Sequence, residues 1–193
     1  EGKVGTHFDA VRRSISEAIS ESGMENHILS KKAYLDVHTG LPNKSRCEDL
    51  LNSSGFITEP LCFVMFDLNN LKEVNDTLGH AAGDSMIANF AHILRKVVPE
   101  KDFVGRYGGD EFMAVIYHTD RQEVEGILDS LRREADAANR DGNQLPLSYA
   151  YGWAISADYE GCVMQTLLDK ADYCMYENKR AYYATHDRRA PRS

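Results

Sequence analysis

The sequence predicts a mixed α/β (α+β) domain in which helices flank a central mixed, mainly antiparallel sheet. The apolar run at 61–66 is typical of a strand buried on both faces. Between 83 and 98, apolar side chains recur at three- and four-residue steps, which predicts an amphipathic helix. The order strand, helices, hairpin, helix, strand, helix favours a sheet with helices packed against it.

The first segment, residues 1–34, is predicted to be a helical linker, because apolar residues from Phe8 onward recur with helical spacing. Gly23 interrupts this stripe. Two alternatives stay open for the segment. It is either one amphipathic helix packed on its own domain or a coiled-coil stalk that sets how two copies face each other. A loop at 36–43 and a short helix at 44–52 follow.

The rest of the chain forms one domain, which we place at 35–184. After the strand at 61–66, the expected elements are a helix from Asn69 or Asn70, a helix at 83–98, strands at 103–107 and 112–117, a helix at 121–140, a strand at 147–155, a helix at 163–183 and a flexible tail at 185–193. The adjacent glycines of the hairpin, Gly108 and Gly109, favour a tight turn with positive φ.

The composition fits one domain plus an appendage. A chain of 193 residues with 42% hydrophobic residues can bury one proper core. Its net charge of -8 argues against a nucleic-acid polymer as partner, because a backbone-binding surface needs clustered Lys and Arg. The four cysteines lack C-x-x-C spacing and are read as reduced thiols. Without a long apolar run or an export signal, we expect a cytoplasmic chain with no direct membrane contact.

Acidic side chains stand where two predicted strands meet turns. Asp67 ends the most hydrophobic strand, and Asp110 and Glu111 follow the glycine pair. If the two strands are neighbours, these carboxylates converge on one edge of the sheet and form an oxygen-rich site suited to Mg²⁺. The alternatives are that Asp67 caps the following helix and that Asp110 is an ordinary turn residue.

The run from Arg106 to Phe112 matches the GGDEF signature of diguanylate cyclases without a substitution. Further marks of that family follow the family's order: Asp36 to Asn43, Asp67 to Lys72, Asn75-Asp76, Gly79-His80, Gly83-Asp84, Ala171-Asp172, Met175-Tyr176 and Lys179. The chain therefore resembles the GGDEF family over residues 35–179. The resemblance implies a palm-like nucleotide cyclase fold with an N-terminal signalling helix, and the condensation of two GTP molecules into cyclic di-GMP and two pyrophosphates.

The resemblance implies that metal ions are held by Asp67, the backbone carbonyl of Leu68 and Asp110. The expected ion is Mg²⁺, with Mn²⁺ as a substitute. Asp110 is also the implied acceptor of the proton from the GTP 3′-hydroxyl, although a metal alone can acidify that hydroxyl. Glu111 is close enough in sequence to share either task.

The resemblance also implies a catalytic lysine and a set of substrate-binding residues. The substrate-binding residues are Asn75, His80, Asp84, Gly108, Gly109 and Lys179. Lys72 and Lys179 contact the triphosphate, and Lys72 offsets charge on the transferring phosphate. Asn75 and Asp84 read the guanine edge, whose donors and acceptors adenine does not share, and His80 supports this pocket. The two glycines let the ligand approach the backbone closely.

One departure from the family pattern affects feedback. The family has an Arg-x-x-Asp motif for product inhibition before its signature, and here Pro99 replaces the Arg while Asp102 is retained. Proline has no guanidinium group to grip a guanine or phosphate. We therefore expect the allosteric inhibitory site to be lost.

Two other departures lie near the predicted substrate. Tyr183 stands where the family often carries Arg, so one phosphate contact is missing or is supplied by Arg180. Asn69 and Asn70 replace an acidic residue and an aromatic or His residue, which removes one charge from the metal site. The acids Asp67, Asp110 and Glu111 are untouched, so we expect activity.

The reaction joins two nucleotides, so the resemblance implies a homodimer in which each 3′-hydroxyl attacks the α-phosphate of the opposite GTP. Because the chain begins at Glu1 and not Met, we also expect a longer intact protein with an upstream sensory domain. Two alternatives remain. A non-catalytic GTP-binding regulatory module would not need Asp110 and Glu111, and an enzyme that joins GMP to AMP disagrees with Asp84.

Overall fold

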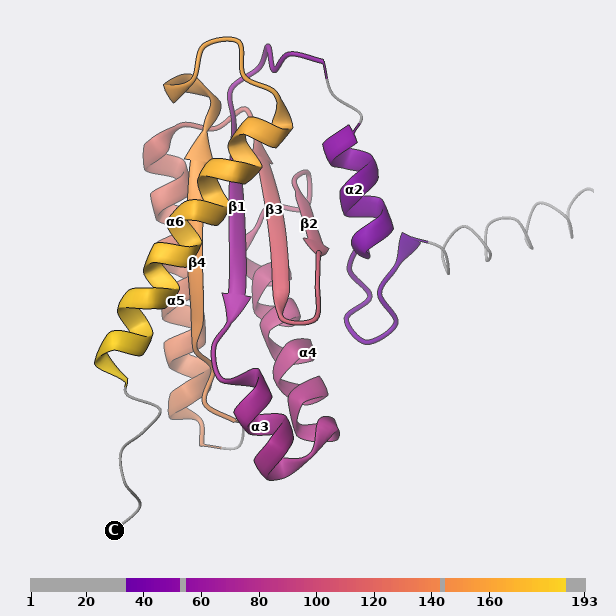
Figure 1. Cartoon of the computed structure of the whole chain (residues 1–193), viewed down its shortest axis with the longest axis vertical. Coiled ribbons are helices and arrows are strands. Elements are labelled where there is room, and N and C mark those ends of the chain that lie inside the picture. Colours follow the sequence, from indigo (N-terminus) through magenta and orange to yellow (C-terminus); the bar gives the residue numbers. More distant parts are fainter. Residues whose placement is uncertain (1–33, 53–54, 143–144, 187–193) are drawn as a thin grey trace, which may run out of the picture.

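The computed structural model describes residues 34–52, 55–142 and 145–186. Its centre is a four-stranded sheet in the order β2-β3-β1-β4, and each neighbouring pair of these strands is antiparallel. Helices cover both faces of the sheet (Figure 1). The predicted α/β (α+β) class, with a mainly antiparallel sheet flanked by helices, is confirmed.

The elements follow the predicted order. The strands are β1 (Leu61–Leu68), β2 (Phe103–Arg106), β3 (Glu111–Tyr117) and β4 (Tyr149–Ile155). The helices are α2 (Lys44–Asn52), α3 (Leu71–Leu78), α4 (His80–Val97), α5 (Arg121–Arg140) and α6 (Met164–Thr185), with a short 3₁₀ turn at Ser156–Asp158. The bounds of α2 and α5 agree with the prediction at both ends.

Strand β1 divides the core, because successive side chains of a strand point to opposite faces of the sheet. Val64 and Phe66 belong to a buried cluster with α4 and α5. Phe63 and Met65 belong to a second cluster, which includes residues of α2 and α6. The same alternation directs Asp67, the next odd-numbered residue, toward the face that α6 covers.

Helix α6 lies close to the edge strand β4 because Gly152 has no side chain. A Cβ at Gly152 would lie 2.2 Å from the carbonyl oxygen of Ala171 and 2.2 Å from the backbone nitrogen of Met175. Further along the helix, the Asn178 side-chain oxygen accepts a hydrogen bond from the Tyr151 N–H at 3.2 Å. These contacts determine where the C-terminal half of α6 lies relative to the sheet.

The opposite edge strand, β2, is also covered. The Arg106 N–H donates to the carbonyl oxygen of Pro42 at 2.8 Å. Gly105 faces α2, where a Cβ would lie 2.4 Å from Sγ of Cys47. The segment before β1 therefore packs along this edge of the sheet.

Helix α4 begins at His80, three residues before the predicted start. The chain turns at Gly79, whose φ of 87° separates α3 from α4. Gly83 lies inside the helix and is buried under the side chain of Asn75, where a Cβ would lie 2.0 Å from Oδ1. The prediction mistook a glycine required by packing for a glycine that starts a helix.

The predicted linker, apart from Tyr34, and the C-terminal residues from 187 lie outside the described residues. Among the helices that the structure describes, none has the length and apolar character needed to cross a membrane.

Candidate active site

Three predicted site acids lie together at one end of the β1–β3 pair. In the antiparallel register, Asp67 lies opposite Glu111. The Leu68 N–H donates to the carbonyl oxygen of Asp110 at 2.9 Å, which holds this residue beside the end of β1. The N-cap of α3 is Asn70, so the alternative in which Asp67 caps that helix is wrong.

Lys179 of α6 forms an ion pair with Asp67. Its Nζ lies 2.6 Å from Oδ2 of the carboxylate, and both side chains are largely shielded from water. Asp67 is only 7% exposed. The lysine expected to contact a triphosphate therefore neutralises one of the expected metal ligands in this structure.

The acids perturb one another's protonation. Burial raises the pKa of Asp67, the hydrogen bond from Lys179 opposes that rise, and the charges of Asp110 and Asp172 add to it. Burial also raises the pKa of Glu111, helped by the charges of Asp67, Asp110 and Asp172. Neighbouring carboxylates disfavour each other's ionised form, and a bound cation relieves that repulsion.

The residues present fit a divalent cation. Oδ1 of Asp67 is buried and has no hydrogen-bond partner among the described residues. Within the described ranges, no group of three or more His, Cys, Asp or Glu side chains is arranged to hold a metal. The expected ligands, Asp67, Asp110 and the Leu68 carbonyl, comprise two carboxylates and a backbone oxygen. A Mg²⁺ ion held by these three oxygen ligands would take its other ligands from nucleotide oxygens and water.

The glycine turn between β2 and β3 differs from the prediction. Neither Gly108 nor Gly109 has positive φ, so the expected positive-φ turn is wrong. The connection spans 107–110, and the Gly108 N–H donates to the Glu111 carbonyl at 3.1 Å, so a two-residue turn is not formed. The Glu111 side chain packs against Gly108, where a Cβ would lie 2.5 Å from Oε2 and would displace that carboxylate.

Arg106 fixes the glycine turn to the loop before α2. Its guanidinium donates to the carbonyl oxygens of Gly108 and Gly109 at 3.2 and 2.8 Å. Its Nη1 lies 3.0 Å from Oδ2 of Asp36, a residue 70 positions away in sequence. Asp36 also accepts hydrogen bonds from the Thr39 N–H and hydroxyl at 2.9 and 2.8 Å. These segments line a groove of about 450 Å³.

Asp36→Asn is expected to lower stability in a pH-dependent way. Burial raises the pKa of Asp36, but hydrogen bonds from Thr39 and the Arg106 guanidinium outweigh burial and hold the pKa below its usual value. A carboxylate with a depressed pKa stabilises the fold above about pH 4 and loses that effect as the pH falls through its folded pKa. The substitution should therefore cost about 2 kcal/mol at pH 7.

Urea unfolding of both proteins between pH 7 and pH 3 measures this difference. The gap between wild type and Asp36→Asn should narrow as the pH falls. A gap that stays constant over this range would show that the Asp36 charge does not stabilise the fold.

The predicted nucleobase residues lie on α3 and α4. Asn75 is half-buried because its side chain lies over Gly83. His80 and Asp84, in the first turns of α4, are exposed, as is Lys72 in the first turn of α3. Asn75 thus packs against Gly83, the residue before Asp84. The side chains of Lys72, His80 and Asp84 lie at the surface.

Two departures from the family pattern have structural roles here. The Asp102 N–H donates to the Pro99 carbonyl at 2.9 Å, and Oδ1 of Asp102 accepts from the Tyr117 N–H at 3.0 Å. Asp102 therefore holds the end of β3, and no arginine within the described residues is paired with it. Asn69 is fully buried, and its amide donates to the Ser148 hydroxyl at 2.9 Å.

Comparison with known proteins places this arrangement in a family. A family model described as "Diguanylate cyclase, GGDEF domain" matches residues 33–183. Diguanylate cyclase TpbB of Pseudomonas aeruginosa is 31% identical over 185 residues, which cover 92% of this chain and 42% of the relative. The chain therefore spans less than half the length of that relative.

Two solved structures have similar folds. The coiled coil and GGDEF domain of DgcB from Caulobacter crescentus, solved in complex with c-di-GMP, gives a TM-score of 0.80 at 22% identity and covers 90% of this chain and 95% of that one. The GGDEF domain of TpbB gives a TM-score of 0.64 at 32% identity and covers 76% of this chain and 89% of that one. Since the family match runs from before α2 into α6 and includes the acids at the ends of β1 and β3, the chain belongs to the GGDEF domain family of diguanylate cyclases.

Proposed function

We propose that this chain is an active diguanylate cyclase, which condenses two GTP molecules into cyclic di-GMP and two pyrophosphates. The observation that supports this best is the cluster of Asp67, Asp110 and Glu111 at adjacent strand ends. Asp67 and Glu111 have raised pKa values, and Oδ1 of Asp67 is buried without a hydrogen-bond partner among the described residues. Titratable groups with perturbed pKa values are typical of functional sites. Intact Asp110 and Glu111 weigh against a module that only binds GTP, because such a module needs no acceptor for the proton of a 3′-hydroxyl.

The acids have distinct roles in this proposal. Asp67, the Leu68 carbonyl and Asp110 hold Mg²⁺, or Mn²⁺ in its place. A divalent cation bound there supplies positive charge that lowers the pKa of the 3′-hydroxyl and offsets the charge of the triphosphate. Asp110 accepts the hydroxyl proton while the 3′-oxygen bonds to the α-phosphorus of the opposite GTP and the bond to pyrophosphate breaks. Glu111 assists in either task.

The remaining residues bind and select the substrate. Lys72 and Lys179 contact the triphosphate, and Lys72 offsets charge on the transferring phosphate. Asn75 and Asp84, supported by His80, pair with the guanine edge and so favour GTP over ATP. Gly108 and Gly109 allow the backbone of the turn to approach the nucleotide. Each subunit binds one GTP, and catalysis requires two subunits that face each other.

Incubation of the protein with Mg²⁺ and GTP, followed by chromatography and mass spectrometry, tests this function. We expect cyclic di-GMP with two pyrophosphates per product, a specific activity that rises with protein concentration, and no incorporation of ATP. Binding of GTP without any product would instead favour the regulatory module. A mixed dinucleotide formed from GTP and ATP would contradict the role given to Asp84.

A further inference from the structure

Two tyrosines near the end of α6 hold the residue that begins α3. The Tyr182 hydroxyl accepts a hydrogen bond from Nδ2 of Asn70 at 3.1 Å, and the Tyr183 hydroxyl accepts one from the Asn70 N–H at 3.3 Å. The two rings pack edge to face with centroids 5.2 Å apart, and His186 stacks on Tyr182 at 4.2 Å. Packed rings thus present both hydroxyls to a single residue.

Asn70 has an uncommon backbone conformation. Its φ of 60° and ψ of 13° are left-handed, and it is the N-cap of α3 without a side-chain capping bond. Asn adopts this conformation more readily than most residues, but right-handed and extended conformations remain favoured for an unrestrained chain. The bonds to the tyrosines satisfy both the backbone and the side-chain amide of Asn70. They therefore stabilise the left-handed conformation from which α3 starts.

The tyrosines share a face of α6 with Lys179. Positions 179, 182 and 183 are related by three- and four-residue steps, which place side chains next to each other on a helix. Lys179 contacts Asp67, and the tyrosines contact Asn70, three residues further along the same segment. One helix face is therefore joined both to the acidic cluster and to the start of α3.

We propose that Tyr182 and Tyr183 are positioning residues for triphosphate binding. By fixing Asn70, they set the direction of α3 and hence the place of Lys72 relative to Lys179 on α6. The inference rests on the proposed function, because it takes the triphosphate of GTP as the ligand of both lysines. Tyr183, at a position where the sequence departs from its family, acts through Asn70 and contributes no charge of its own.

The double substitution Tyr182→Phe and Tyr183→Phe removes both hydroxyls and keeps both rings. Calorimetric titration with a non-hydrolysable GTP analogue and Mg²⁺ should show binding about fivefold weaker. In steady-state assays, KM should rise by a similar factor and kcat should fall as well, because Lys72 is also proposed to offset charge on the transferring phosphate. Without nucleotide, hydrogen exchange of the Asn70 amide should become faster, because it loses its acceptor.

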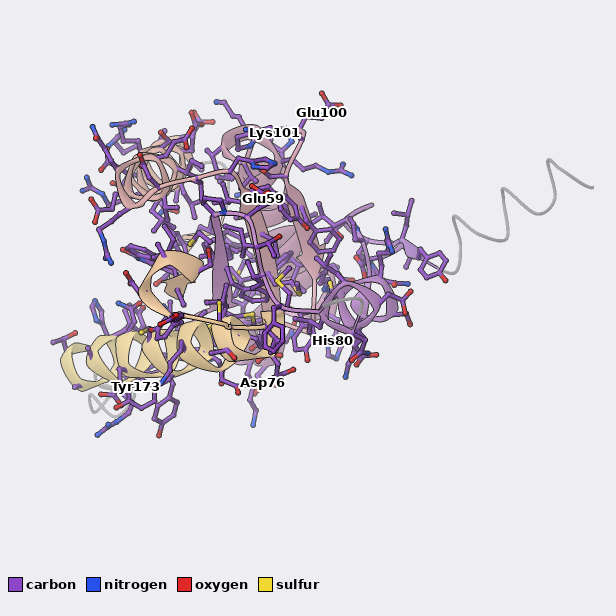
Figure 2. All side chains as sticks on the ribbon, turned by 90° about the horizontal axis from the view of Figure 1, so that it is seen from above. Glu59, Asp76, His80, Glu100, Lys101 and Tyr173 are labelled. Atoms are coloured by element: carbon purple, nitrogen blue, oxygen red, sulfur yellow. The ribbon has the colours of Figure 1, made fainter. Side chains whose placement is uncertain are left out.

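Tyr173→Phe is the matched control. This tyrosine also lies on α6, is 65% exposed, and points away from the sheet into solvent (Figure 2). Its substitution should leave both analogue binding and Asn70 exchange unchanged. Asn70→Gly, which accepts the left-handed conformation but lacks the side-chain amide, should be non-additive with Tyr182→Phe in a double-mutant cycle.

The outcomes separate this inference from the proposed function. If the wild type forms no cyclic di-GMP, the proposed function fails, while analogue binding and amide exchange still decide the role of the tyrosines. Faster Asn70 exchange with unchanged analogue affinity would show a purely structural contact and overturn the inference. The inference is also overturned if Asn70 amide exchange in the double variant equals that of wild type, or if kcat falls without a rise in KM. It fails as well if the wild type does not bind the analogue.

Discussion

Asp110→Asn is expected to reduce cyclic di-GMP formation by about 10³-fold, because it removes the carboxylate proposed as proton acceptor and metal ligand. The substitution keeps the shape of the side chain, and the Leu68 N–H can still donate its hydrogen bond to the backbone carbonyl of residue 110. It also removes a charge that raises the pKa values of Asp67 and Glu111. Thermal stability without metal should therefore be equal to or above that of wild type.

Product formation and thermal unfolding, measured on the same preparations, test this prediction. Asp136→Asn, an exposed residue on α5, is the matched control and should keep wild-type activity. Retention of more than about a tenth of the wild-type rate by Asp110→Asn would exclude Asp110 as the main proton acceptor, since such groups contribute 10²-fold or more.

Gly152→Ala is expected to be the most destabilising of the substitutions described here. The new Cβ would lie 2.2 Å from two backbone atoms of α6, and backbone cannot move aside as a flexible side chain can. Overpacking of this kind costs about 3 kcal/mol, which corresponds to a Tm lower by about 10 °C in a domain of this size. Because α6 must shift, the Lys179–Asp67 pair should also be disturbed and activity should fall.

Gly126→Ala is the control for the Gly152 substitution. Gly126 lies in α5 with nothing within 4 Å of its would-be Cβ, so Ala should raise stability through its better helix propensity. Thermal and urea unfolding of the two variants should therefore move in opposite directions. A neutral or stabilising effect of Gly152→Ala would mean that α6 does not pack on β4 as closely as the structure shows.

Much of the fold could be predicted because its signals are local. The apolar run of β1 and the apolar stripes of helices α4 and α5 can each be recognised in a short stretch of consecutive residues. The meeting of Asp67 with Asp110 could also be anticipated, since a hairpin beside a buried strand places their ends together.

The parts that could not be predicted depend on contacts between distant segments. In the sequence, Gly83 looks like a helix start and Gly108 like part of a tight turn. In the structure, the side chain of Asn75 lies over Gly83 and that of Glu111 packs against Gly108. The pair between Asp36 and Arg106 joins segments 70 residues apart, and neither residue's partner is apparent from its neighbours. The contacts of Asn70 with α6 also could not be predicted from the sequence, because they join residues more than 100 positions apart.

Each outer strand of the sheet has one edge N–H that is already hydrogen-bonded within the domain. Exposed strand edges recruit further strands and promote aggregation, and here the Tyr151 N–H on β4 is occupied by Asn178 while the Arg106 N–H on β2 is occupied by Pro42. These two positions are therefore closed to a strand of a second copy. In the proposed dimer, the two domains would then meet through side-chain surfaces, and such an encounter needs no rearrangement of the sheet.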